Sequence, residues 1–89
     1  MGHRSDRDAL RGNLYAVDVP ALMDALNDEI WPEDALQLMG DAVLVVARAR
    51  VDAAGPAGHR CAAALRDRGW EGDHELADQI DAMLGVAPT

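Results

Sequence analysis

The sequence predicts a small all-α protein of about five helices. Apolar residues recur at three- and four-residue spacing along most of the chain, and proline and glycine fall at the ends of these periodic segments. The length of 89 residues fits one domain, residues 1–89. With 17 alanines and no phenylalanine, the core must rely on close approach of helices. We expect an N-terminal helix in 1–17, followed by two αα-hairpin units, 18–55 and 56–85.

The first helix is expected to be short and amphipathic. Ser5, followed three residues later by Asp8, resembles a capping box. Leu10 and Leu14 share one helical face, and the arginines at 4, 7 and 11 share another. The helix should end near Tyr15, because the following "AVDVP" places a residue before proline, where helical angles are disfavoured.

Asp18 is a plausible N-cap for the second helix, along which apolar residues recur every four positions at Leu22, Leu26 and Ile30. The third helix is expected to begin at Pro32, since proline at the first helical position and acids in the first turn both favour a start. Its apolar positions have helical spacing: Ala35, Leu36, Met39, Ala42, Val43 and Val46. Gly55 and Pro56 should close it.

Residues 42–51, "AVLVVARARV", also fit a strand, because β-branched residues and an Ala/Arg alternation are typical of strands. We interpret them as helix. Pro56 is then an early position of the fourth helix, with Gly69 as its C-terminal cap. Asp73 should cap the fifth helix, and Gly85 should end it. The apolar stripe of that helix is Leu76, Ile80 and Leu84, and residues 86–89 should be frayed.

The two tryptophans mark an internal repeat. Superposing Trp31 on Trp70 gives the pattern A-L-x-D-x-x-W-x-x-D twice, in "ALNDEIWPED" and "ALRDRGWEGD". "DAVL" at 41–44 then matches "DAML" at 81–84 after one inserted residue, which favours helix for the valine-rich segment. A period near forty residues with two helices per unit belongs to the size class of HEAT and armadillo repeats.

"LMDALNDEIWPEDALQLMGDAV" resembles a HEAT-type repeat, with the L-x-x-A-L-x-D close of a first helix, a turn containing proline, and an Ala/Leu-rich second helix. "CAAALRDRGWEGDHELADQIDAML" is similar, but it lacks the proline and carries an extra residue. The resemblance covers about residues 18–85. It implies a scaffold that binds other proteins through helix faces, and it brings no catalytic residues.

Charge and composition narrow the classes of function. The net charge of −8 would repel a phosphate backbone, so we expect no direct nucleic-acid binding. Acidic segments, 18–41 and 69–89, flank a basic one, 42–68. No apolar run approaches the ~20 residues that span a bilayer, and the N-terminus lacks a signal-peptide core, so we expect a cytoplasmic protein without membrane contact. All eight cations are arginine, a bias typical of GC-rich bacterial genes.

The chain offers little for catalysis. Ser5 and Thr89 lie near its ends, and Cys61 among alanines is expected to be a buried packing residue. Together with Cys61, His59 and His74 could approach a metal, but they lack a recognised ligand spacing. The acid pairs Asp24/Asp28 and Asp78/Asp81 are typical of solvated helix faces. We therefore predict no enzyme activity, no metal and no cofactor.

Three functional hypotheses follow. The first is a non-enzymatic protein–protein interaction or regulatory module; the second is an acidic inhibitor of the antitoxin, immunity or DNA-mimic kind; the third is a small metal protein or enzyme. Each tryptophan should pack against the two helices it joins, and the alternative is that both anchor an interface. Because "AVLVVA" at 42–47 is apolar on every side, we also expect a homodimer. The candidate interface residues are Trp31, Val43, Val46 and Trp70.

Overall fold

The computed structural model describes residues 3–85, with side chains from residue 9 onward. This range contains five α-helices and a short 3-10 turn, and no strand. The predicted all-α fold is therefore confirmed, and the strand alternative for the valine-rich segment is wrong. The elements are α1 (His3–Ala16), α2 (Val19–Leu26), the 3-10 turn η1 (Glu33–Ala35), α3 (Leu36–Ala49), α4 (Val51–Arg68) and α5 (Asp73–Leu84).

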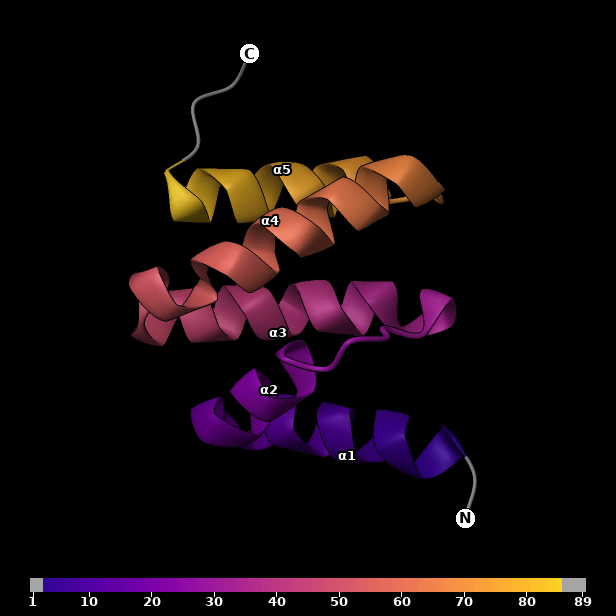
Figure 1. The fold of residues 1–89 in the computed structure, drawn as a ribbon, viewed down its shortest axis with the longest axis vertical. Coiled ribbons are helices and arrows are strands. Elements are labelled where there is room, and N and C mark those ends of the chain that lie inside the picture. Colours follow the sequence, from indigo (N-terminus) through magenta and orange to yellow (C-terminus); the bar gives the residue numbers. More distant parts are fainter. Residues whose placement is uncertain (1–2, 86–89) are drawn as a thin grey trace.

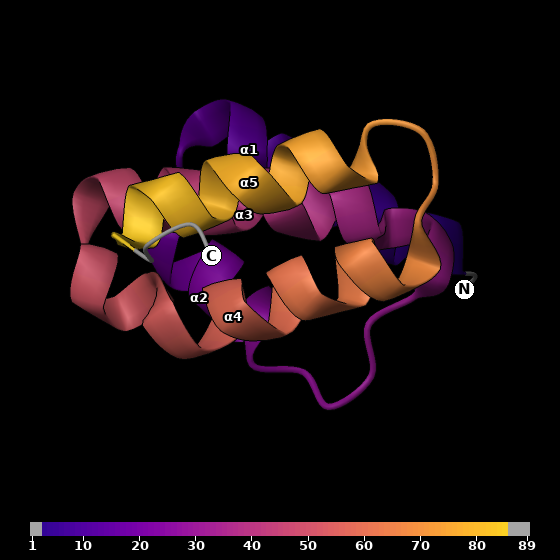
Figure 2. The same ribbon diagram turned by 90° about the horizontal axis from the view of Figure 1, so that it is seen from above.

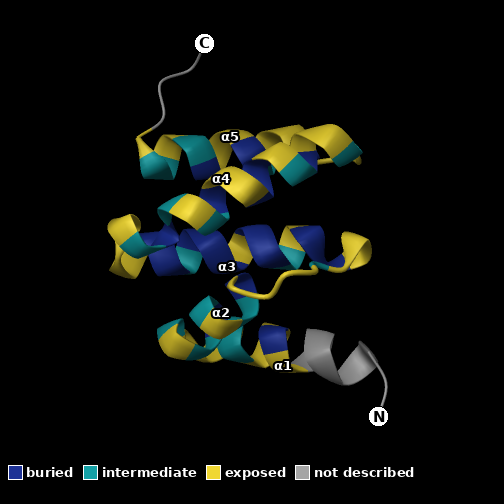
Figure 3. Cartoon of the chain, viewed as in Figure 1, coloured by how far each residue is buried: buried dark blue, intermediate teal, exposed yellow. Residues whose placement is uncertain are grey.

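The helices are stacked along the long axis of the molecule in chain order (Figure 1). Helices α1 and α2 form one end, α3 lies in the middle, and α4 and α5 lie side by side at the other end (Figures 1 and 2). Helix α3 packs against α2 on one side and against α4 and α5 on the other. Most of its surface is consequently buried (Figure 3).

The valine-rich segment is the centre of this single chain. From the sequence, Val43 and Val46 were expected to be interface residues. In the structure they have no exposed surface, so they belong to the core. The apolar surface that led us to expect a homodimer is covered by neighbouring helices. Self-association stays a prediction, now without that support. The buried residues of α3 are Leu36, Met39, Gly40, Ala42, Val43, Leu44, Val46 and Ala47.

Helix α2 begins as predicted but ends early. The Asp18 side chain caps it by accepting a hydrogen bond from the backbone N–H of Ala21 at 3.3 Å. The helix ends at Leu26, where Asn27 forms the C-cap, so Ile30 lies outside it and is 82% exposed. Pro32 precedes η1 as its N-cap, with an extended ψ of 133°, and is not the first residue of a helix.

The boundary between α3 and α4 differs from the prediction. Helix α3 ends at Ala49, and Arg50 (φ −150°, ψ 87°) turns the chain. The Arg50 carbonyl then accepts the N–H groups of Ala53 and Ala54, which starts α4. Gly55 and Pro56 therefore lie inside α4, and the expected division between units 18–55 and 56–85 falls within a helix. As the sixth residue of α4, Pro56 removes one helical hydrogen bond and its ring crowds the carbonyl four residues earlier, a cost that the buried side chains of α4 offset.

Helix α1 begins at His3, two residues before the predicted start at Ser5. The side chains of Ser5 and Asp8, and of the arginines at 4 and 7, lie outside the described side chains, as residues 86–89 lie outside the described chain. Leu10 is buried while Arg11 is exposed, so the predicted separation of faces is confirmed there.

Small residues bring α5 close to its neighbours, as the alanine-rich composition led us to expect. Leu76 of α5 lies directly over Gly40 of α3, and Leu84 lies over Gly58 of α4. A Cβ at either glycine would meet these leucines. No helix within residues 3–85 is long and apolar enough to cross a membrane.

Candidate functional site

Both tryptophans line one open groove of about 420 Å³. Trp31 comes from the connection between α2 and α3, and Trp70 comes from the turn between α4 and α5. The C-terminal half of α4 runs between them and supplies two arginines. We call this surface the Trp–Arg groove; its lining residues are Trp31, Glu33, Leu36, Arg60, Ala64, Asp67, Arg68 and Trp70.

A buried ion pair builds the turn that carries Trp70. Asp73 has no exposed surface, and its carboxylate accepts hydrogen bonds from Arg68 Nε (2.8 Å) and Nη2 (2.6 Å). It also accepts the backbone N–H of Trp70 at 2.8 Å. Gly69 and Gly72 have positive φ angles (68° and 82°), which allow the chain to reverse within this short turn. The sequence predicted Asp73 as the N-cap of α5. In the structure it is the first residue of α5, and its carboxylate accepts the hydrogen bonds that hold the turn together.

The same ion pair shifts both pKa values. The Arg68 guanidinium holds the pKa of the Asp73 carboxyl well below its usual range, helped by the hydrogen bonds from Gln37 and Trp70. The hydrogen bonds to Asp73 in turn raise the pKa of Arg68. Both groups therefore carry their charges throughout the neutral range, and a paired, hydrogen-bonded arrangement is what allows charges to be buried.

Two long-range contacts tie this turn to the start of α3. Arg68 Nη1 donates a hydrogen bond to the carbonyl of Glu33 in η1. From α3, Gln37 Nε2 donates to the carbonyl of Glu71 at 3.0 Å and to Asp73 Oδ1 at 3.1 Å. The connections that carry the two tryptophans are therefore held together by polar contacts as well as by the core.

Trp31 is fixed by an arginine from α4. The Arg60 guanidinium lies 4.0 Å from the Trp31 ring centroid, a cation–π geometry. Its two Nη atoms donate to the carbonyls of Asp28 and Glu29 at 2.7 Å each, which pins the long connection against α4. Trp31 also packs on the core, while its indole N–H is buried without a hydrogen-bond partner in the described chain.

Trp70 is arranged differently. The Arg68 guanidinium stacks 4.0 Å from its ring centroid, but the residue is 50% exposed. Trp31 is thus packed on the core with an arginine of α4 over its ring, whereas Trp70 presents much of its indole to solvent. When Trp31 is superposed on Trp70, a shift of 39 residues, Arg60 aligns with Ala21 and Arg68 with Glu29. The stacking of arginine on tryptophan therefore does not follow the internal repeat. The repeat itself stays a prediction. Sequence reasoning missed both arginines; the run R-x-W-x-x-D, residues 68–73, is a local signal for Arg68, and Arg60 has no such signal.

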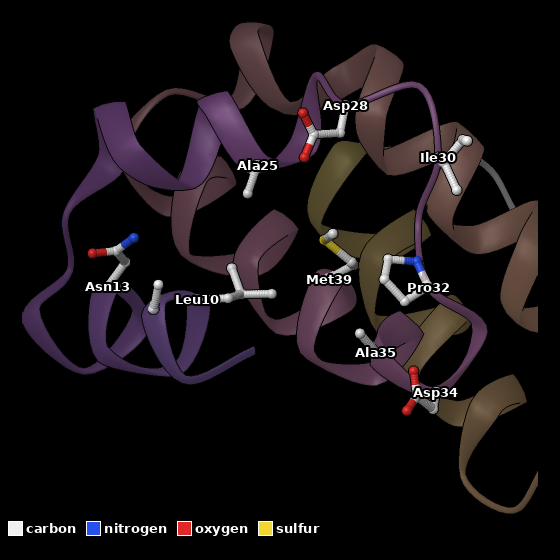
Figure 4. Close-up of a pocket in the computed structure, with 10 residues that line it drawn as sticks. Leu10, Asn13, Ala25, Asp28, Ile30, Pro32, Asp34, Ala35 and Met39 are labelled. Carbon is white, nitrogen blue, oxygen red and sulfur yellow. The ribbon is translucent and has the colours of Figure 1, made fainter. Parts of the chain in front are cut away.

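A second hollow, of about 500 Å³, lies between α1, α2 and the 27–35 connection (Figure 4). Leu10 and Met39 lie in its middle, with Asp28 and Asp34 toward opposite edges (Figure 4). Its polar lining consists of Asn13 and those two aspartates, without a serine, threonine, cysteine or histidine among the described lining residues. It also lacks the tryptophan–arginine stacks of the Trp–Arg groove.

The residues considered for chemistry are dispersed. Cys61 is fully buried, as predicted, and burial raises the pKa of its thiol to about 12. His59 and His74 are exposed. Within the described chain no group of three or more His, Cys, Asp or Glu side chains could hold a metal ion.

The paired acids serve surface structure. Asp78 and Asp81 of α5 both accept hydrogen bonds from Arg66 of α4, at 2.9 and 2.6 Å. Asp24 lies on the exposed side of α2.

Comparison of the chain with protein-family models, with curated proteins and with solved structures finds no match. The groove is therefore interpreted from its own geometry, which offers held aromatic and guanidinium surfaces suited to binding.

Proposed function

We propose that this chain is a non-enzymatic protein–protein interaction module that contacts its partner through the Trp–Arg groove. One observation carries the proposal: two tryptophans from separate connections lie in a single groove, each with an arginine stacked on its ring. Tryptophan and arginine are the side chains most enriched among residues that dominate binding free energy at protein interfaces. The composition supports a bacterial, cytoplasmic setting for the module.

Rigidity strengthens the case for Trp70 as an anchor. Its backbone N–H is bound by the buried Asp73 carboxylate, and Arg68 supports one face of its ring. A half-exposed indole held in this way loses little conformational entropy when a partner covers it. A partner protein can pack against this large, fixed apolar surface and make hydrogen bonds to the polar atoms beside it.

The groove chemistry supports binding over catalysis. Its titratable side chains are two carboxylates and two guanidiniums, without a histidine, cysteine or hydroxyl among the lining residues. The chain's single cysteine is buried elsewhere with its thiol pKa raised to about 12, so the reactive thiolate is scarce at neutral pH.

A second candidate is an acidic inhibitor of the antitoxin, immunity or DNA-mimic kind. The net charge of −8 favours it, because a strongly negative surface attracts a basic partner over long range. This candidate uses the same kind of contact, but its partner would be a basic nuclease or toxin, and binding would block that partner's activity.

Site-specific photo-crosslinking in the source cells tests the proposal. A photoreactive phenylalanine analogue replaces Glu71, the exposed neighbour of Trp70, in one variant and Tyr15 in the control; Tyr15 is an aromatic residue of α1, 93% exposed and outside the groove. We expect a discrete crosslinked partner from position 71 only. Added wild-type protein should compete for it, and folded Trp70→Ala protein should not. Equal crosslinking from both positions, or competition by the Trp70→Ala variant, would contradict the proposal.

A further inference from the structure

We infer that the Trp–Arg groove takes a basic segment of its partner, placing a lysine or arginine side chain against the exposed part of the Trp70 indole. This inference rests on the proposed function and specifies the chemistry of the partner. It follows from which charges in the groove are already matched, which hydrogen-bond donors are already used, and which aromatic surface is open.

The charges lining the groove are negative in sum. Glu33 and Asp67 are exposed, and their carboxylates make no ion pair or hydrogen bond in the described chain. The positive charge of Arg68 is matched by the buried carboxylate of Asp73 at 2.6 Å. Arg60 donates only to two neutral backbone carbonyls, so its charge offsets one of the two exposed carboxylates and leaves the other in excess. A cation entering the groove therefore meets a surplus of negative charge.

Many of the donors that an anionic ligand would need are occupied or covered. Three of the five N–H groups of Arg68 already donate, to Asp73 and to the carbonyl of Glu33, and the side chain is only 5% exposed. Two of the five N–H groups of Arg60 donate to the 27–32 connection. A phosphate or carboxylate could use the remaining N–H groups of the exposed Arg60, but the same groove carries Glu33 and Asp67. The groove is thus better suited to a basic partner than to an acidic one.

The exposed surface of Trp70 completes the site for a cation. Indole is the aromatic group that attracts a guanidinium or ammonium most strongly, through its negative face. Arg68 covers the ring at one position, but with half of Trp70 exposed there is room for a second side chain. Repulsion between this side chain and Arg68 is reduced because the Arg68 charge is neutralised by Asp73. The net charge of −8 would also steer a basic segment toward the protein.

Titration of the full chain with defined peptides tests the inference. The probe is an end-blocked peptide of alternating arginine and glycine, and its control replaces arginine with glutamate. Calorimetry at low salt measures affinity, and the fluorescence of Trp70, the single tryptophan of a Trp31→Phe variant, reports contact at the groove. We expect the arginine peptide to bind and to change this fluorescence, and the glutamate peptide to do neither.

Matched charge variants separate the groove from general attraction. The double variant Glu33→Gln with Asp67→Asn should weaken binding of the arginine peptide about threefold to tenfold, and Trp70→Ala should weaken it to a similar extent. The control Asp24→Asn with Asp52→Asn removes the same charge from exposed positions outside the groove, and should change affinity less than twofold. Circular dichroism confirms that each variant is folded.

The outcomes also separate this inference from the proposed function. Equal weakening by the two double variants would mean non-specific attraction and would overturn the inference. Absence of arginine-peptide binding, or equal binding of the glutamate peptide, would overturn it as well. In each of these cases a partner crosslinked at position 71, and competed only by protein with an intact Trp70, would leave the interaction module standing with a partner of different chemistry.

Discussion

Asp73 combines complete burial with a full negative charge. It is tolerated because its oxygens accept hydrogen bonds from Arg68, Gln37 and the backbone of Trp70. Removing one member of such a buried pair leaves the other charge without compensation, which is far more costly than removing a surface pair. The turn that presents Trp70 therefore depends on this carboxylate.

We predict that Asp73→Asn lowers the free energy of unfolding by about 3–5 kcal/mol, because Arg68 stays buried without a counter-charge. The matched control is Asp78→Asn; Asp78 pairs with Arg66 at 2.9 Å but its side chain is 77% exposed, so the loss should be about 1 kcal/mol or less. Urea unfolding at pH 7 measures both. Equal losses would show that the buried pair does not support the turn.

The lowered pKa of Asp73 gives this contribution a defined pH dependence. In the unfolded chain the carboxyl binds a proton near pH 4, where the folded protein still keeps it ionised. Its stabilisation is therefore complete above about pH 4 and declines as the pH falls further. Between pH 5 and pH 2.5 wild-type stability should fall more steeply than that of Asp73→Asn; parallel profiles would contradict a lowered pKa.

Cys61 should be chemically silent in the folded protein. Burial raises the pKa of its thiol to about 12, and its sulfur lies 3.9 Å from the carbonyl oxygen of Leu36. At pH 8 we expect a disulfide exchange reagent to label the folded chain only as fast as the chain opens, and to label it promptly in urea. Prompt labelling without urea would contradict the burial.

The raised pKa also means that this thiol's contribution to stability, full below pH 9, declines as the pH rises toward 12.

At the residue scale, the sequence predicted part of the site. The paired tryptophans were visible as a repeated pattern, and the burial of Cys61 followed from its alanine neighbours. Arg68 was missed although its contacts with Trp70 and Asp73 lie within five residues. Arg60 was not found because its contacts with the connection that carries Trp31 span 31 and 32 residues. Local charge patterns carry no record of such contacts.

At the scale of elements, prediction was accurate where a single residue controls a helix end. Asp18 caps α2, and Gly69 and Gly85 end α4 and α5 with left-handed φ angles. It was wrong at Gly55 and Pro56, which were expected to separate helices and instead lie within α4. There, tertiary burial outweighs a local preference for ending the helix. The buried residues of α4 are Ala54, Gly58, Cys61, Ala62 and Leu65.

Two glycines of α4 provide a matched test of its packing. A Cβ at Gly58 would collide with Leu84 and lie 3.3 Å from a Val43 methyl, whereas one at Gly55 would meet nothing within 4 Å. We predict that Gly58→Ala destabilises by about 1 kcal/mol, since overpacking exceeds the gain in helix propensity. Gly55→Ala should lower stability less, because the gain in helix propensity offsets the crowding of the new Cβ by the Pro56 ring. Urea unfolding measures both; equal losses would mean that α5 packs more loosely on α4.

In the whole molecule, packing of the core stabilises the folded state, whereas the surplus of negative charge destabilises it. The core is continuous through α3, so the valine-rich segment is buried without a partner. The chain, however, carries 16 acidic residues against 8 arginines, and the closest described pairs use only a few of them. The surplus acids repel one another, which lowers stability while leaving a field that attracts basic partners.

This balance predicts an unusual response to salt. Raising the ionic strength from 0.01 to 0.15 M shortens the Debye length from about 30 to about 8 Å, which screens repulsion between carboxylates on different helices. The buried Arg68–Asp73 pair should be little affected, because screening is weak inside the protein. At pH 7 we therefore expect the thermal midpoint to rise by about 2–5 °C, equivalent to somewhat less than 1 kcal/mol. Near pH 4.5, the isoelectric point, the rise should largely disappear because the net charge is close to zero. A midpoint that falls with salt at pH 7 would mean that surface pairs such as Arg66 with Asp81 contribute more than the repulsion does.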